Sequence, residues 1–526
     1  GGEDRGLRGG AQTWRVAGPF GQPSMKDFEK PLPPETDRRP DASYQGKSGQ
    51  VTWSLVTIDE NVSRRRVEQT EGAQFSADRS RVASASDLTK AKPIVIGPAS
   101  SGARFTLDFG RELSGFVRLD LHGPAGAVIE MQYAEHPGAN IGGPDTYVLR
   151  EGKQQFETYH YQGFRYLTVT AKEVTKPLTI NSINTLFFSY PLESRGAFKC
   201  SDPLLNKIWN VGCHSLRCCL HETYEDCPGY EQLQYWGDAR VETLVQMAAF
   251  GDARPFARGL RAMAWSRQPD GITYSRYPCW EPQIIPTFSL IWILSLQDYM
   301  LWEGDLELVR EVWPVADDVL EWFNGHVGAD GVLTDVPQWV FIDWSGDLGR
   351  FDKGASSILN AFYYGALVTA ADLCGEQGNT SKAALYRSRA AALKTAYEKA
   401  FWSPALSAYV NSYRDGKQGT SLSQHAQALA LLFDLAPVER RRPLVGQMLR
   451  EDTMQATPYF MFYVLRALDH TGYYKYAPDQ MRRWKSMLDR GATTWLEEWA
   501  NKRSWCHAWS SAPTYELSTR VLGVRP

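Results

Sequence analysis

The sequence has few cysteines and no apolar run long enough to cross a membrane. No stretch reaches the ~18 consecutive apolar residues that a spanning helix needs. The eight cysteines contain no C-x-x-C pair and no matching histidine spacing, which excludes the usual zinc motifs. They are also too sparse in 526 residues for a disulfide scaffold, although one or two bridges are compatible with them.

Charge of one sign is also lacking, because 57 basic residues nearly balance 60 acidic ones and the net charge is −3. No segment carries the basic stripe that phosphate binding requires, so we expect no nucleic-acid partner. No cluster has the ligand density of a dedicated calcium loop; no metal or cofactor is predicted, and a structural cation such as calcium is compatible with the sequence. The oligomeric state is not indicated.

The start of the chain bears on localisation. Residues from Gly1 onward lack the charged and then apolar pattern of a signal peptide. The chain also lacks an initiator methionine, as a processed or trimmed chain does. This leaves export open, and we expect a secreted or periplasmic protein.

Residues 1–192 have the pattern of β-strands. Segments 104–109, 115–121 and 128–133 alternate apolar and polar side chains, and Gly-Pro-Ala-Gly at 123–126 is a turn signal. This pattern predicts an antiparallel β-sandwich accessory region. Within it, the polar segment 64–92 reads as a surface connection that could divide two sub-modules.

Helical periodicity begins after residues 201–203 and continues almost to the end of the chain. Helices are expected near 204–211 and over 287–301, 306–323, 361–373, 381–401, 423–435 and 459–468. Roughly 320 residues at about 25 to 30 per helix and loop give about a dozen helices. That number closes an (α/α)6 barrel, which we predict for residues 193–526.

The stretch 225–240 places three carboxylates among aromatic side chains at the start of a predicted long helix. Pro228 would occupy the first turn, and Glu231, Tyr235 and Asp238 would then share one helix face. A structural explanation competes with the functional one, because acidic residues near a helix N-terminus complement the helix dipole.

Three loops repeat the combination of carboxylate and ring. They are 268–281, 338–347 and 491–499, the last followed by Cys-His-Ala-Trp at 506–509. Aromatic residues are more often packing than binding groups, because they bury large areas. However, carboxylates accept hydrogen bonds from hydroxyls and ring faces stack on sugars, so the repeated combination favours a glycan site.

At these residues the chain resembles the glycoside hydrolase family 78 α-L-rhamnosidases. Its Asp-Cys-Pro at 226–228, Glu231 and Gly-Asp at 237–238 match one family motif. Residues 491–497, 507–509 and 522–524 match a second. The resemblance extends from about residue 104 to the C-terminus. It implies an inverting hydrolase that releases α-L-rhamnose from a rhamnose-containing oligosaccharide or polysaccharide.

The resemblance also implies roles for individual residues. Glu231 would be the general acid and Glu497 the general base that activates water on the opposite face of the sugar. Inversion needs these carboxyl groups about 6.5 to 9.5 Å apart. The other candidates for the sugar site are Asp226, Asp238, Trp236, Tyr230, Arg276, Trp280, Asp343, Trp344, Trp495, His507 and Trp509. Glu498, beside the base, is read as a surface carboxylate.

A general acid must carry a proton near neutral pH, so the pKa of Glu231 has to be raised. We expect desolvation by Tyr230, Tyr235 and Trp236 to raise it, with repulsion from nearby carboxylates. One departure from the family is Tyr-Glu-Gln-Leu at 230–233, where many members have Arg-Asp-Glu-Arg. This leaves the preference for the leaving group open.

Two other functions are compatible with the sequence. A polysaccharide lyase on the same barrel would need a tyrosine or histidine base and a cation, which Tyr230, Tyr277, His507 and Arg276 could supply. Only elimination creates a conjugated double bond that absorbs in the ultraviolet. A non-catalytic carbohydrate-binding protein on a decayed hydrolase scaffold is the third alternative, because a fold alone does not fix a function.

Overall fold

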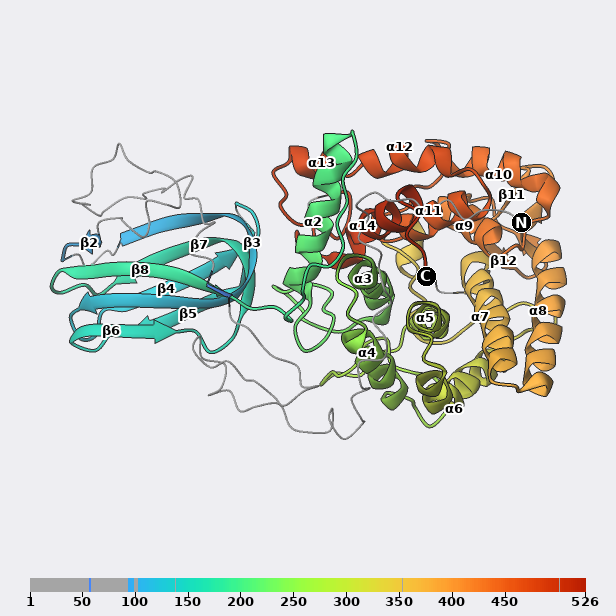
Figure 1. Ribbon diagram of the computed structural model, residues 1–526, viewed down its shortest axis with the longest axis horizontal. Helices are drawn as coiled ribbons and strands as arrows, with labels where there is room; N and C mark the ends of the chain where they lie inside the picture. Colours follow the sequence, from blue (N-terminus) through green and yellow to red (C-terminus); the bar gives the residue numbers. More distant parts are fainter. Residues whose placement is uncertain (1–55, 58–92, 99–102, 138, 352, 501) are drawn as a thin grey trace, which may run out of the picture.

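The computed structural model describes residues 56–57, 93–98, 103–137, 139–351, 353–500 and 502–526 (Figure 1). The predicted division near 64–92 lies outside the described residues. Figure 1 shows a β-domain beside a larger helical domain. The predicted boundary between residues 192 and 193 falls in the segment that connects the last strand of the first domain to the first helix of the second.

The β-domain is an antiparallel sheet in the order β1-β8-β3-β7-β4-β5, with β2 paired to β8 and β6 paired to β3. Its strands are β1 (Val56–Thr57), β2 (Ile94–Ile96), β3 (Ala103–Gly123), β4 (Val128–Ala134), β5 (Asn140–Val148), β6 (Gly152–Glu157), β7 (Gln162–Lys172) and β8 (Leu178–Phe187).

The long strand β3 pairs with three other strands of this sheet. It contains both predicted strands, 104–109 and 115–121, as one element with a shift in register between Asp108 and Leu113. It pairs with β7 on both sides of the shift, as far as Gly115, then with β8 from Gly115 and with β6 from Arg118. Phe105 and Leu119 on β3 and Ile129 on β4 belong to one hydrophobic core, so this long strand contributes to the core along most of its length.

The helical domain contains α2 to α14. Their bounds are α2 (Pro203–Cys219), α3 (Trp236–Ala249), α4 (Arg254–Trp265), α5 (Pro286–Glu303), α6 (Leu306–Asn324), α7 (Ser357–Glu376), α8 (Thr380–Phe401), α9 (Gln424–Leu432), α10 (Arg441–Met448), α11 (Met461–His470), α12 (Ala477–Arg482), α13 (Lys485–Asp489) and α14 (Ala512–Glu516). Short strands β9 (Ala355–Ser356), β10 (Trp402–Ser403), β11 (Ala408–Tyr409), β12 (Ser412–Arg414) and β13 (Lys417–Gln418) lie in its connections.

The predicted barrel is confirmed, and its inner wall is a closed ring of helices. Helices α3, α5, α7, α9, α11 and α14 contact one another in this order, and α14 contacts α3 again, which closes the ring. These helices are buried on nearly every side, as the apolar run from Phe288 to Leu296 in α5 illustrates. A helix that is apolar all round belongs in a core, whereas α4 and α6 have one buried face and lie outside the ring.

The two domains share an interior. Cys218, Cys219, Cys506 and Ala508 of the helical domain pack into the hydrophobic core of the sheet. Arg165 on β7 binds both oxygens of Asp108 at 2.8 and 3.0 Å, and its Nη1 donates to the Gly491 carbonyl of the helical domain at 2.9 Å. The described part of the chain contains no helix that is long and apolar enough to cross a membrane.

Gly163 on β7 is packed against the loop that carries Glu231. Its N–H donates to the Pro228 carbonyl at 2.9 Å, and an added Cβ would lie 2.5 Å from Pro228 Cγ and 2.9 Å from Pro228 C. We therefore expect Gly163→Ala to displace this loop and to cost about 1–3 kcal/mol of unfolding free energy. Denaturant unfolding measures the loss, and Gly143→Ala, where the new Cβ meets nothing, serves as the control. An unchanged midpoint in Gly163→Ala would contradict the expectation.

Candidate active site

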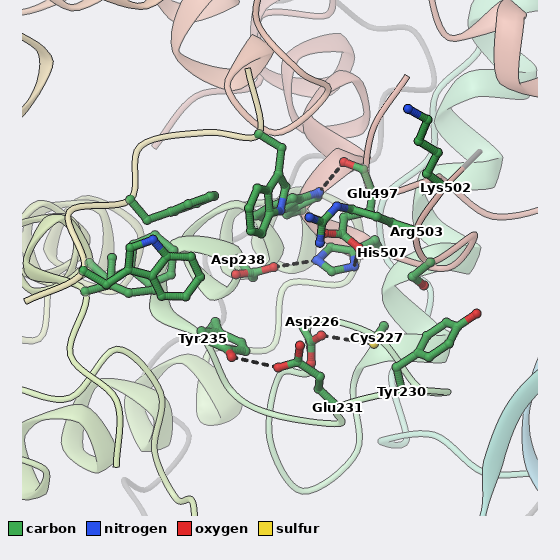
Figure 2. A pocket seen from close by; sticks show the side chains of 17 residues that line it. Asp226, Cys227, Tyr230, Glu231, Tyr235, Asp238, Glu497, Lys502, Arg503 and His507 are labelled. Atoms are coloured by element: carbon green, nitrogen blue, oxygen red, sulfur yellow. Dashed lines mark hydrogen bonds and ion pairs between the residues drawn. The ribbon is translucent and has the colours of Figure 1, made fainter. Parts of the chain in front are cut away.

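A cavity of about 300 Å³ lies where the loops at one end of the barrel meet (Figure 2). Its walls contain four carboxylates, one histidine, two cations and several rings. The lining residues are Asp226, Cys227, Tyr230, Glu231, Tyr235, Asp238, Ile285, Phe288, Trp339, Phe341, Trp344, Glu497, Lys502, Arg503, Ser504, His507 and Trp509.

The segment that carries Glu231 is a closed loop, and the prediction that a helix runs through it is wrong. The Asp226 N–H donates to the Leu233 carbonyl, and Asp226 Oδ1 accepts the Leu233 N–H at 3.0 Å. Gln232 adopts a left-handed conformation with φ of 56°, which a helix does not allow. Helix α3 therefore begins only at Trp236. Pro228 turns the loop and does not begin a helix.

Glu231 and Tyr235 nevertheless meet, although not on a helix face. The Tyr235 hydroxyl donates to Glu231 Oε2 at 2.7 Å, and Arg276 Nη1 donates to the same oxygen at 3.3 Å. Arg276 also binds the Tyr235 hydroxyl. The loop 268–281 thus contributes a cation that fixes Glu231 from outside the cavity lining.

The expected burial of Glu231 is not found. Its side chain is 51% exposed, whereas Tyr235 and Tyr230 flank it without covering it. Trp236 cannot cover it, because this ring is fully buried in the barrel core and donates to Ser295 Oγ at 3.0 Å. The protein itself therefore does not desolvate Glu231 in the way expected from the sequence.

Glu497 and His507 face Asp238 from the C-terminal part of the chain. His507 Nε2 lies 2.9 Å from Asp238 Oδ1 in the first turn of α3, and His507 Nδ1 lies 3.7 Å from Glu497 Oε2. Arg503 Nη1 is 3.4 Å from Glu497 Oε1. Figure 2 shows Glu497 and Arg503 on one side of the cavity and Glu231 on the other, with Asp226, Asp238 and His507 between them.

Rings form a further wall of the cavity. Trp339, Phe341 and Trp344 come from the loop 338–347 and contact one another, with centroids 4.9 to 6.1 Å apart. The Arg503 guanidinium lies 3.7 Å above the Trp344 ring. Beside Glu497, Trp509 Nε1 donates to the Glu497 carbonyl at 2.9 Å, and its ring contacts His507. An apolar wall facing carboxylates is the mixture that a sugar ring requires.

The electrostatics of the cavity keep a positive charge on His507. Burial lowers the pKa of His507, but the carboxylates of Glu497, Asp238 and Asp226 outweigh burial and raise this pKa to about 9. Burial also raises the pKa of Asp226, to about 8, with a further rise from Asp238 and Glu231. Burial raises the pKa of Asp238 despite its hydrogen bond with His507. At pH 7 the cavity floor therefore holds an imidazolium, beside an Asp226 carboxyl whose pKa is raised above its ordinary range.

These shifts predict how stability depends on pH. Because the folded pKa of His507 is above the ordinary 6.5, the stabilisation is complete below pH 6.5 and is lost as pH rises through about 9. We expect His507→Gln to have a melting temperature about 2–5 °C below that of the wild type at pH 6, and a smaller difference at pH 10. His160→Gln, at a half-exposed histidine, is the control. A difference that stays constant between pH 6 and pH 10 would refute the charged imidazolium.

Five predicted subsite residues do not line the cavity, and one of them is Arg276, which holds Glu231 from outside the lining. Trp236 and Trp495 are fully buried in the core, and Trp280 is 87% exposed outside the cavity. Asp343 is fully buried and binds His425 Nε2 at 2.6 Å and the N–H groups of Trp344 and Thr457 at 2.9 Å. Asp343 therefore supports the wall that Trp344 forms. The aromatic residues in the loops correctly indicated the region of the cavity. The sequence pattern does not show which of these rings faces the cavity.

The other predicted residues lie at the cavity, and the structure adds several that the sequence reasoning missed. Asp226, Tyr230, Asp238, Glu231, Glu497, Trp344, His507 and Trp509 belong to the lining. Tyr235 had been placed on the predicted face with Glu231 and Asp238, whereas the residues not predicted for the site are Cys227, Ile285, Phe288, Trp339, Phe341, Lys502, Arg503 and Ser504. Trp339 and Phe341 belong to the loop 338–347, which carried a signal, whereas Ile285 and Phe288 look like ordinary core residues in the sequence.

Asp226, Cys227 and His507 offer ligand atoms within 4.8 Å of one another, so we tested whether they fit a metal ion. Cys227 Sγ donates to Asp226 Oδ2 at 3.0 Å, and burial raises the pKa of this thiol well above its ordinary value. His507 Nε2 is bonded to Asp238. A protonated thiol and an imidazolium are poor metal ligands, so the group does not fit a resident ion. All eight cysteines are free thiols.

The helical domain is a closed barrel of helix hairpins, and the loops at one end enclose a cavity of carboxylates and rings. The model of the bacterial alpha-L-rhamnosidase six-hairpin glycosidase domain matches residues 193–521, and the model of the bacterial alpha-L-rhamnosidase concanavalin-like domain matches residues 99–188. The chain therefore belongs to the bacterial α-L-rhamnosidase family.

Two curated relatives are similar to this chain in sequence. An alpha-L-rhamnosidase of Formosa agariphila is 23% identical over 383 residues, which cover 66% of this chain and 39% of the relative. An alpha-L-rhamnosidase of Streptomyces avermitilis is 25% identical over 482 residues, which cover 85% of this chain and 43% of the relative. The chain thus spans less than half the length of these relatives.

Solved structures show the same fold. A family 78 rhamnosidase of Bacillus sp. GL1 superposes with a TM-score of 0.77 at 29% identity, over 81% of this chain and 47% of that protein. A rhamnosidase from Klebsiella oxytoca with rhamnose bound superposes with a TM-score of 0.73 at 22% identity, over 89% of this chain and 98% of that protein.

Proposed function

We propose that this protein is an inverting α-L-rhamnosidase that releases terminal rhamnose from a glycan or glycoconjugate. The observation that carries the proposal is one cavity in which Glu231 and Glu497 occupy opposite sides, with Asp226, Asp238 and His507 between them. Two carboxyl groups flanking the bond to be cleaved are the general requirement of glycoside hydrolysis. The family and the named relatives support rhamnose as the sugar.

Glu231 is assigned as the general acid because of its place at the mouth. The leaving group departs toward solvent, and Glu231 is the half-exposed carboxyl of the cavity. Arg276 and the Tyr235 hydroxyl both hold Glu231 Oε2, so Oε1 is left to face the glycosidic oxygen. When a substrate covers the mouth, its aglycone removes water from Glu231. The proton then passes from Glu231 to the leaving oxygen as the glycosidic bond breaks.

Glu497 is assigned as the general base because it lies deeper and has two positive neighbours. Its side chain is 12% exposed, and Arg503 and the imidazolium of His507 lie 3.4 and 3.7 Å from its two oxygens. From this side, Glu497 takes a proton from a water that attacks the anomeric carbon. The sugar leaves with inverted configuration, as a base and an acid on opposite faces require.

The floor and the ring wall bind the sugar. Asp226 and Asp238 are buried and directed into the cavity, where they exchange hydrogen bonds with sugar hydroxyls. Trp339, Phe341 and Trp344 offer ring faces to the C–H face and the methyl group of rhamnose. The substrate of this assignment is a rhamnose-containing oligosaccharide or polysaccharide.

A lyase is less well supported by this cavity. A lyase base has to accept a proton, but His507 is held as a cation with its pKa raised to about 9. Burial raises the pKa of the Tyr230 phenol, so a phenolate is disfavoured as well. Tyr277 does not line the cavity.

The test is the product that the wild type forms from 4-nitrophenyl α-L-rhamnoside and from rhamnose-containing oligosaccharides. Proton NMR recorded within the first minutes should show β-rhamnose, which then mutarotates. First-formed α-rhamnose would contradict inversion. A rise in ultraviolet absorbance with a rhamnose-uronate oligosaccharide would indicate elimination instead, and binding of rhamnose without turnover of any rhamnoside would indicate the carbohydrate-binding alternative.

A further inference from the structure

Glu135 belongs to the β-domain, yet its carboxyl group is bonded to the segment that carries Glu497. It follows β4 and is 2% exposed. Its Oε1 lies 2.9 Å from Ser504 Oγ, and its Oε2 accepts the Trp505 N–H at 2.8 Å. The next residue, His136, stacks on Trp505 with ring centroids 4.4 Å apart. Both contacts cross from one domain to the other.

The contact reaches the proposed base through the backbone. The Glu497 N–H donates to the Ser504 carbonyl at 2.9 Å, and the His507 N–H donates to the Trp495 carbonyl at 2.8 Å. These two bonds pair Trp495 and Glu497 with His507 and Ser504. Ser504 therefore sits between Glu135 and Glu497, and it also lines the cavity.

The hydrogen bonds at Ser504 are compatible with a neutral Glu135. Ser504 Oγ accepts the Cys506 N–H at 3.1 Å. It also lies 3.1 Å from the Cys506 carbonyl and 2.9 Å from Glu135 Oε1, but its single hydroxyl hydrogen can serve only one of them. If Glu135 is a neutral acid, its own proton can go to Ser504 Oγ, the Ser504 hydroxyl can go to the Cys506 carbonyl, and every group is satisfied.

We propose that Glu135 is a positioning residue that the β-domain supplies to the active site, and that it works as a neutral carboxylic acid holding residues 497–507 and thereby Glu497 in place. The inference rests on the proposed function, because its kinetic test requires hydrolysis of a rhamnoside. Its physical basis is that a buried acid satisfied on both oxygens fixes a loop more firmly than loop residues can alone.

The charges around Glu135 are compatible with this state. Burial raises its pKa to about 7, although the hydrogen bonds from Trp505 and Ser504 and the charge of His507 lower it. Glu112 on β3 and Cys227 and Tyr230 of the loop 225–235 also face Glu135. Glu135 is therefore protonated below about pH 7 and becomes charged above it, where one acceptor at Ser504 loses its hydrogen.

Glutamine and alanine separate this role from bulk stability. In Glu135→Gln, the amide NH2 donates to Ser504 Oγ and the amide oxygen accepts from Trp505, as in the neutral acid. We expect Glu135→Gln to keep kcat within about threefold of the wild type and Glu135→Ala to lose about ten- to a hundredfold in kcat, with KM changed far less, because a misplaced base slows the chemical step. In the wild type, kcat should decline above pH 7, and in Glu135→Gln the decline should move to higher pH.

The control is the same pair of substitutions at Glu130, on the adjacent strand β4, where the carboxylate forms a surface pair with Lys172. Both Glu130 variants should match the wild type. Equal losses of kcat in Glu135→Gln and Glu135→Ala would overturn the neutral-acid assignment. Wild-type kcat in Glu135→Ala would overturn the positioning role, and an unchanged pH profile in Glu135→Gln would overturn the neutral-acid assignment.

A second readout does not depend on activity. Amide hydrogen exchange followed by mass spectrometry should show faster exchange over residues 497–507 in Glu135→Ala, because the Trp505 N–H has lost its acceptor, and wild-type exchange in Glu135→Gln. If the wild type hydrolyses no rhamnoside, the proposed function fails. The exchange pattern still tests whether Glu135 holds this segment in place, because it does not depend on activity. Unchanged exchange in Glu135→Ala would refute that hold.

Discussion

Glu497→Gln is expected to lower kcat by about a thousandfold, because general acid–base catalysis contributes roughly 10² to 10⁴. The amide cannot take a proton from the attacking water, whatever leaving group the substrate carries. The loss should therefore be equal for 4-nitrophenyl α-L-rhamnoside and for a rhamnoside of an unactivated alcohol. KM should change little, because the amide keeps the size of the carboxyl and the contact with Arg503 and His507 is long. Steady-state kinetics on both substrates measures this.

The matched control for Glu497 is its neighbour. Glu498 is half-buried but does not line the cavity, so Glu498→Gln should keep the wild-type kcat. A loss confined to Glu498→Gln would show that the base has been assigned to the wrong carboxyl. A Glu497→Gln variant with near-wild-type kcat would remove the base from the mechanism.

Glu231→Gln is expected to have an effect that depends on the leaving group. Without the proton donor, an unactivated alcohol has to leave as an alkoxide, so we expect kcat for such a rhamnoside to fall by about a thousandfold or more. 4-Nitrophenolate leaves without a proton, so the same variant should lose far less on the nitrophenyl substrate. The ratio of the two losses identifies the acid, since the base variant should lose equally on both.

Glu281 provides the control for Glu231, because it is an exposed glutamate in the neighbouring loop and lies outside the cavity. Glu281→Gln should behave as the wild type on both substrates. Equal losses for both substrates in Glu231→Gln would contradict its role as the acid. A leaving-group dependence that appears in Glu497→Gln would show that the two carboxyl groups have exchanged roles.

The helices of the barrel could be predicted because their signal is local. The run from Phe288 to Leu296 is apolar on all sides and became part of α5, an inner helix. The loop that carries Glu231 was predicted wrongly for an equally physical reason. Its residues suit a helix, but the bonds between Asp226 and Leu233 close a loop that outweighs this propensity. Local propensity is a weak prior wherever a buried polar group finds a different partner.

The sequence by itself determined the order of the two domains, most helices of the barrel and the chemical types of the active-site residues. Periodicity and residue type depend only on neighbours along the chain, and the motifs around Glu231 and Glu497 lie within short segments. The tertiary structure alone decided that Trp236 and Trp495 turn into the core, that Asp343 supports a wall, and that Arg503 reaches Trp344. It also decided that Glu135 binds Ser504, 369 residues away. Such contacts depend on which loops the closing ring of helices brings together, and no local pattern records that.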